Sequence, residues 1–114
     1  MKMKRFDIWT ADLNPQIGTE PGKIRPVLII QTDLLNGIHP STLVCPITTN
    51  VVVESELLRV HLKTGQANLQ KESDVMIDQI RAIDNKRLLK KLGVLPPELR
   101  EALLRNLKLM LDLD

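Results

Sequence analysis

Residues 17–31 read Ile-Gly-Thr-Glu-Pro-Gly-Lys-Ile-Arg-Pro-Val-Leu-Ile-Ile-Gln, and the rest of the chain is organised around this stretch. The glycines and proline within residues 18–22 favour a loop, whereas the apolar run at residues 27–30 favours a buried strand. Arg25 stands where the loop meets the strand. An arginine at this point can offer a planar fork of donors to a phosphate or form a structural salt bridge to Glu20, and spacing alone leaves both interpretations open.

The 114 residues fit one domain, residues 1–114, with a single hydrophobic core. A composition of 43% hydrophobic and 26% charged residues is typical of a globular protein, and every apolar run is far shorter than the roughly 18 residues of a membrane helix. The basic N-terminus is followed by Asp7 and Asp12 and not by an apolar segment, so it is not a secretory signal and we expect a cytoplasmic location. Cys45 is the only cysteine, which excludes an internal disulfide and a thiolate metal site.

Basic residues concentrate towards the C-terminal end of the chain. Residues 81–108 hold eight lysines and arginines against three acidic residues, an excess of five positive charges, whereas the whole chain has a net charge of +2. This segment suits contact with an anion, but a solvated helical face is an equally good interpretation. Phe6 and Trp9 are the only aromatic residues, which argues against modules that stack bases on aromatic platforms.

Alternating apolar residues and turn signals predict five strands, at residues 4–13, 26–32, 41–48, 58–62 and 73–83. Pro46 cannot donate a ladder hydrogen bond, so the third strand should lie at a sheet edge or carry a bulge just before Thr48. Asp84 or Asn85 should cap a short helix that runs through residue 92 and ends at Gly93.

Pro96 and Pro97 predict the start of a final helix. Its expected core stripe consists of Leu99, Leu103, Leu107, Met110 and Leu111. Leu104 and Leu109 widen this stripe, which fits either a well-buried helix or contact with a partner subunit. The predicted fold class is therefore mainly β (α+β), a small curved β-barrel-like sheet with a short helix and a C-terminal helix packed on it.

Few side chains have the spacing of a known catalytic or metal site. His39 is expected in a loop and His61 on the solvated face of a strand, so surface histidines are favoured over a metal site or an acid/base pair. Cys45 lies in an apolar strand and is expected in the core. Thr48 is either an ordinary strand residue or a hydroxyl donor to a ligand.

Four motifs occur in order along the chain: Asp7-Ile8 with Asp12-Leu13-Asn14-Pro15, residues 18–27, Pro46-Ile47-Thr48-Thr49, and residues 78–84. With these motifs the chain resembles the MazF/PemK toxin family from about residue 4 to residue 92, and its predicted C-terminal helix is compatible with that family. Phe6 is a departure, because the family usually has glycine before the aspartate.

The resemblance implies a homodimeric, SH3-like barrel toxin of a type II toxin-antitoxin system, which cuts single-stranded RNA (mRNA) at short specific sequences without a metal or other cofactor and is neutralised by an antitoxin. The family's catalytic arginine and threonine match Arg25 and Thr48. The implied reaction is attack of a ribose 2′-hydroxyl on the adjacent phosphorus, which leaves a 2′,3′-cyclic phosphate and a 5′-hydroxyl. Because a guanidinium stays protonated, Glu20 is our candidate proton acceptor.

Substrate binding is expected at Thr19, Thr49 and Gln79, with Arg81 either on a phosphate or anchoring a neighbouring aspartate. An alternative is a CcdB-like toxin that binds a protein target such as DNA gyrase and has no nuclease activity. Those toxins act through a Trp-Gly-Ile C-terminus, whereas this chain ends Asp-Leu-Asp. A catalytically inactive regulator is a third alternative.

Overall fold

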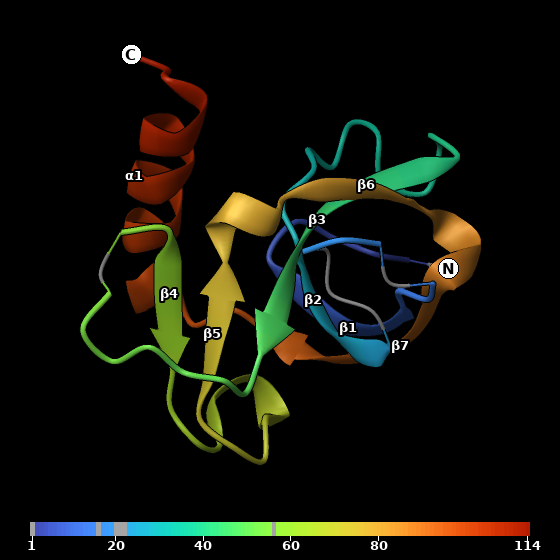
Figure 1. Ribbon diagram of the computed structural model, residues 1–114. Coiled ribbons are helices and arrows are strands. Elements are labelled where there is room, and N and C mark those ends of the chain that lie inside the picture. Colours follow the sequence, from blue (N-terminus) through green and yellow to red (C-terminus); the bar gives the residue numbers. More distant parts are fainter. Residues whose placement is uncertain (1, 16, 20–22, 56) are drawn as a thin grey trace.

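The computed structural model describes residues 2–15, 17–19, 23–55 and 57–114. Seven antiparallel strands form one sheet in the order β4-β5-β3-β2-β1-β7, with β6 also beside β3, and one α-helix follows them (Figure 1). The elements are β1 (Asp7–Asp12), β2 (Ile24–Ile29), β3 (Ser41–Thr48), β4 (Arg59–Leu62), β5 (Ser73–Met76), β6 (Arg81–Asp84), β7 (Leu88–Val94) and α1 (Arg100–Leu111). The predicted fold class, a mainly β, SH3-like curved sheet with a C-terminal helix, is confirmed.

Strand β3 is central, and the prediction that Pro46 places it at an edge is wrong. One side of β3 pairs with β2, while the other side pairs with β6 up to Val44 and with β5 from Ile47. Pro46 lies between these two pairings, where the strand changes partner. A residue without an N–H is tolerated there because the ladder is already interrupted.

The predicted strand at residues 73–83 is broken into β5 and β6 by a 3₁₀ turn, Ile77–Gln79. Ile47 faces Val75 and Val44 faces Arg81, so three steps along β3 correspond to six along the later chain. The three extra residues are those of the turn. The apolar run continues through the break because Ile77 is buried, which is why the sequence pattern does not reveal it.

The predicted helix at residues 84–92 is also wrong. Asp84 does cap a turn, since its side chain accepts the Lys86 N–H at 2.8 Å, but the turn is a single 3₁₀ turn and β7 follows it. Pairing with the edge of β1 overrides the local helix signal. Gly93 lies within β7 and ends no helix; a Cβ there would come within 2.7 Å of the Ala67 carbonyl oxygen, so this strand and the neighbouring 3₁₀ turn require a glycine.

Two hydrophobic clusters lie on the two faces of the sheet. The first face is covered by α1, and its buried residues include Ile8, Leu28, Cys45, Ile47, Leu62, Val75 and Leu103. The second face buries Met3, Trp9, Ala11, Leu13, Val27, Ile29, Val44, Ile83 and Leu88. Because side chains alternate along a strand, Arg25 lies on the second face with Val27 and Ile29.

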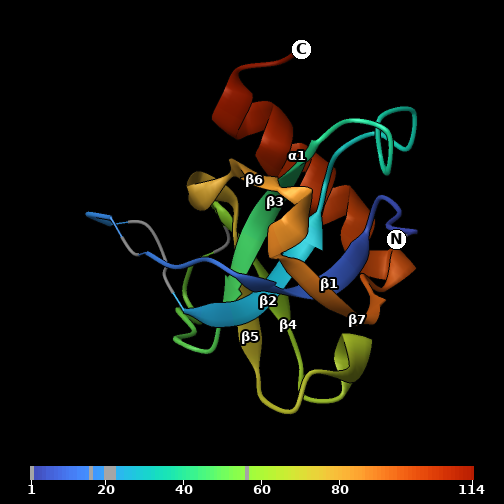
Figure 2. The same ribbon diagram turned by 90° about the vertical axis from the view of Figure 1, so that its right-hand side faces the viewer.

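Helix α1 is confirmed, but its predicted core stripe is only partly buried. Leu103 is fully buried, whereas Met110 and Leu111 are 39% and 48% exposed. In both views the C-terminal end of the helix extends beyond the strands, which removes it from the core (Figures 1 and 2). Along the described part of the chain, no helix has the length and apolar composition needed to cross a membrane.

Phe6 adopts the left-handed backbone region, with φ of 74°. This explains why the resembling family usually has glycine here, since glycine enters that region without strain. The chain keeps the backbone conformation with a phenylalanine, so the departure changes the side chain and not the start of β1.

Candidate functional site

Four residues from four neighbouring strands form one row across the second face, here called the cross-strand row: Arg25, Thr48, Asp74 and His61. Thr48 faces Asp74 in the β3–β5 ladder, and Asp74 faces His61 in the β4–β5 ladder. The β2–β3 ladder ends two residues short of this point, and its register continued outward places Arg25 opposite Thr48. Directly opposed residues point to the same face of a sheet, so the four side chains share one surface.

Arg25 and Thr48 are half-buried where β2 begins and β3 ends. The Thr48 hydroxyl oxygen accepts the Asn50 N–H at 3.1 Å. This bond uses a lone pair of the hydroxyl, so its proton can be donated to an anionic ligand. A cation and a hydroxyl donor placed across from each other suit the binding of a phosphate.

Asp74 is a buried carboxylate, with its side chain 1% exposed. One oxygen accepts the Val52 N–H at 2.9 Å and lies 3.3 Å from the Arg59 guanidinium, while the other lies 3.1 Å from His61 Nδ1. Burial of an unpaired carboxylate is costly, and these partners offset that cost. The prediction of His61 as a surface histidine is confirmed, since its side chain is 39% exposed, and its Nδ1 additionally contacts the buried Asp74 carboxylate.

The other predicted site residues are not all in the cross-strand row. Thr19 is exposed between β1 and β2, and Glu20 lies outside the described residues. Gln79 is half-buried in the 3₁₀ turn that follows β5. Arg81 faces Val44, four residues along β3 from Thr48, which at roughly 3.3 Å per residue is a separation of about 13 Å.

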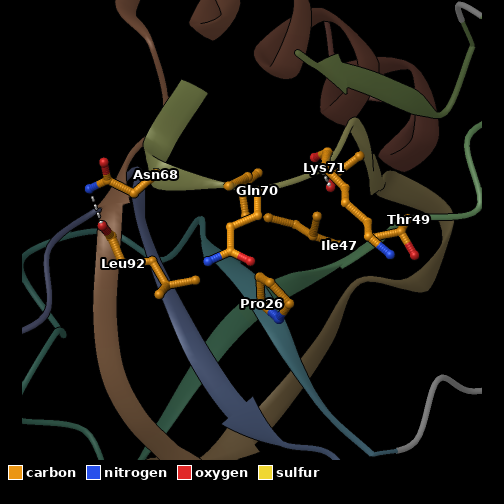
Figure 3. Close-up of a pocket in the computed structure, with 9 residues that line it drawn as sticks. Pro26, Ile47, Thr49, Asn68, Gln70, Lys71 and Leu92 are labelled. Atoms are coloured by element: carbon orange, nitrogen blue, oxygen red, sulfur yellow. Dashed lines mark hydrogen bonds between the residues drawn. The ribbon is translucent and has the colours of Figure 1, made fainter. Parts of the chain in front are cut away.

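Thr49 lies on the opposite face from the row. It lines a cavity of about 290 Å³ together with Pro26, Ile47, Asn68, Leu69, Gln70, Lys71, Ser73 and Leu92 (Figure 3). Pro26 and Thr49 each follow a row residue by one position, so their side chains point to the first face. Lys71 extends towards Thr49 in the figure, while the Gln70 amide hangs over Pro26. The structure thus separates Thr49 from its neighbour Thr48.

Cys45 is a core residue, as predicted, and its side chain is fully buried. Burial raises the pKa of its thiol to about 12, with a smaller contribution from the negative charge of Asp78. The thiol therefore stays protonated and is no nucleophile. Within residues 2–15, 17–19, 23–55 and 57–114, no group of three or more His, Cys, Asp or Glu side chains could hold a metal ion.

Comparison with known proteins identifies the family of this chain. The family model for the PemK-like, MazF-like toxin of type II toxin-antitoxin systems matches residues 4–111. Endoribonuclease EndoA of Bacillus subtilis (strain 168) is 34% identical over 113 residues, which cover 99% of this chain and 97% of that protein. The resemblance seen in the motifs is thereby confirmed.

Solved structures have the same fold. The Mycobacterium tuberculosis toxin MazF-mt6 aligns with a TM-score of 0.80 and 27% identity over 95% of this chain and 98% of that one. An endoribonuclease from a mycobacterial species, solved in complex with its cognate antitoxin, aligns with a TM-score of 0.76 and 18% identity over 98% and 95% of the two chains. The chain belongs to the PemK-like, MazF-like toxins of type II toxin-antitoxin systems, and it is an endoribonuclease.

Proposed function

We propose that the cross-strand row is the active centre, with Arg25 and Thr48 as its catalytic residues. The observation that supports this most directly is the β2–β3 register, whose continuation by two residues puts Arg25 opposite Thr48 on one face. Arg25 and Thr48 lie where β2 begins and β3 ends and are only half-buried, so an extended single strand of RNA can reach these two side chains. The substrate is single-stranded mRNA, cut at short specific sequences without a metal.

In the proposed reaction a ribose 2′-oxygen bonds to the adjacent phosphorus while the bond from phosphorus to the 5′-oxygen breaks. The products are a 2′,3′-cyclic phosphate and a 5′-hydroxyl. Arg25 stabilises the negative charge that builds on the phosphoryl oxygens, and Thr48 donates its hydroxyl proton in a hydrogen bond to one of them. Glu20 is our proposed acceptor of the 2′-hydroxyl proton, and Arg25 is our proposed donor of a proton to the leaving 5′-oxygen, so that one proton is taken up by the protein and one is given to the product.

The bound RNA extends beyond the row. We propose that Thr19 and Gln79 contact bases next to the cut site. Arg81 of β6, which faces Val44 of β3, is proposed to contact a phosphate further from the cut site. Thr49 would then bind a group on the opposite face, in the cavity that it lines. The near-absence of aromatic residues suits recognition by such polar side chains.

We further propose that residues 1–114 act as one cytoplasmic domain that forms a homodimer and is neutralised by an antitoxin. An antitoxin is present in the related mycobacterial structure. The homodimer is supported by exposed apolar residues at the end of α1, namely Leu109, Met110, Leu111 and Leu113, which continue to Leu57. Light scattering of the purified protein tests this, and a monomeric mass at micromolar concentration would contradict it.

The central test is cleavage of a mixed RNA pool in excess chelator, with the cleaved ends mapped. We expect Arg25→Ala and Thr48→Ala each to lower the rate by roughly 100- to 1000-fold while the circular dichroism spectrum is unchanged. Thr64→Ala, an exposed turn residue, is the matched control and should cleave at the wild-type rate. Undiminished cleavage by Arg25→Ala would refute the assigned site, and toxicity with intact RNA would favour the CcdB-like alternative.

A further inference from the structure

The chain that leaves Thr48 passes Asp74 of β5 at residues 49–52, here called the 49–52 turn. At its start the Asn50 N–H donates to the Thr48 hydroxyl oxygen at 3.1 Å. At its end the Val52 N–H donates to Asp74 at 2.9 Å. The orientation of the Thr48 hydroxyl therefore depends on a turn whose far end is held by a carboxylate from another strand.

Arg59 makes a second connection between the same groups. Its Nη1 atom lies 3.3 Å from the Asp74 carboxylate and 3.3 Å from the Asn50 carbonyl oxygen. Asp74 thus holds Val52 directly and Asn50 through Arg59. The peptide groups of Asn50 and Val52 are therefore both connected by hydrogen bonds to the buried Asp74 side chain, the first through Arg59.

A buried carboxylate in β5 lowers the free energy of unfolding unless its partners offset the desolvation of its charge. Asp74 is 1% exposed, so its charge is largely removed from water. Arg59 balances the charge, and His61 Nδ1 lies 3.1 Å from the carboxylate oxygen that does not bind Val52. These contacts fix the carboxylate in one orientation, which is what a positioning group requires.

We propose that Asp74 is a positioning residue for Thr48. It holds the 49–52 turn so that the Thr48 hydroxyl accepts from Asn50 and directs its own proton at the substrate phosphate. Asp74 does not touch the RNA; it acts through the turn. This inference rests on the proposed function of Arg25 and Thr48, and it gives the β5 carboxylate of the cross-strand row a role of its own.

The first test is Asp74→Asn, which keeps the size of the side chain and one acceptor but removes the charge that holds Arg59 and His61. We expect kcat to fall roughly 10- to 100-fold, because a misplaced catalytic group loses that much, while KM changes less than about two-fold. Asp84→Asn is the matched control, since Asp84 also accepts a backbone N–H but lies away from the row, and its kcat should be that of the wild type.

The decisive test combines Asp74→Asn with Thr48→Ala under single-turnover conditions. If Asp74 acts through Thr48, the second substitution should slow the Thr48→Ala enzyme by less than about two-fold. A purely structural effect would reduce both backgrounds by the same factor, and that result would overturn the inference. Wild-type kcat in Asp74→Asn would overturn it as well.

Two further outcomes are separated by the design. If Arg25→Ala is inactive while Asp74→Asn is fully active, the positioning role fails and the proposed function stands; if Arg25→Ala is active, the proposed function itself fails. Should Asp74→Asn not fold, Arg59→Gln removes the guanidinium that connects Asp74 to Asn50 and leaves the Val52 N–H bond to Asp74 in place. We expect Arg59→Gln to lower kcat about five-fold in the otherwise wild-type enzyme and to leave kcat unchanged in the Thr48→Ala background. A change confined to KM would contradict the inference.

Discussion

Phe6 provides a direct test of backbone strain at the start of β1. Its left-handed conformation, with φ of 74°, costs an L-residue roughly 1–2 kcal/mol. Two backbone hydrogen bonds hold it there, from its N–H to the Ile29 oxygen and from the Leu95 N–H to its own oxygen, both 2.8 Å. Its ring contacts the guanidinium groups of Arg5 and Arg100, whose central carbons lie 4.8 and 4.6 Å from the ring centroid.

Two substitutions separate the ring from the strain. Phe6→Ala keeps the strained backbone and loses the ring, whose two cation–π contacts are worth about 0.5–1 kcal/mol each and whose half-burial is worth about 1 kcal/mol. We therefore expect Phe6→Ala to lower the free energy of unfolding by about 2–3 kcal/mol. Phe6→Gly loses the same ring but removes the strain, which should return about 1 kcal/mol.

Urea unfolding followed by fluorescence measures these differences, since Trp9 is the only tryptophan and is 8% exposed. The expected order of stability is wild type, then Phe6→Gly, then Phe6→Ala, with a gap of about 1 kcal/mol in the free energy of unfolding between the two variants. Phe6→Leu is a control that keeps an apolar side chain and the strain but loses the cation–π contacts. If Phe6→Ala were as stable as Phe6→Gly, the left-handed conformation at residue 6 would be refuted.

Two buried groups give further predictions. Asn106→Ala removes the acceptor of the Leu58 N–H, a 2.8 Å bond, so the free energy of unfolding measured in urea should fall by about 1–3 kcal/mol. Lys108→Ala, an exposed position on the same helix, is the control and should change it by no more than about 0.5 kcal/mol. Equal losses in the two variants would contradict this prediction. Because burial raises the pKa of Cys45 from 9.0 to about 12, the unfolded thiol ionises first as pH rises, and the stability that Cys45 contributes relative to Cys45→Ala should decrease between those values. Its native thiol should also resist thiol reagents until urea unfolds the protein.

The elements that could be predicted from sequence are those fixed by local pattern. The bounds of β3 follow from its β-branched and apolar residues, and the cap at Asp84 from its short acceptor side chain. The break at Ile77–Gln79 could not be predicted, because it arises where the chain changes its place along β3 while its apolar pattern continues. β7 has a helical local pattern but forms a strand. Its partner β1 is distant in the sequence, so the pairing that stabilises β7 does not show in the local pattern.

The proposed site depends on strand registers that no single motif contains. Arg25 and Thr48 come from different motifs, and only the β2–β3 register puts them opposite each other. The alternation around His61 first indicated a solvated histidine, yet that same alternation buries Val60 and Leu62 and so fixes the register of β4. A slip of one residue would turn those two side chains out of the core, so β4 is held in the one register that sets His61 against the carboxylate of β5. The pattern that made His61 look unimportant is therefore what brings it into the row.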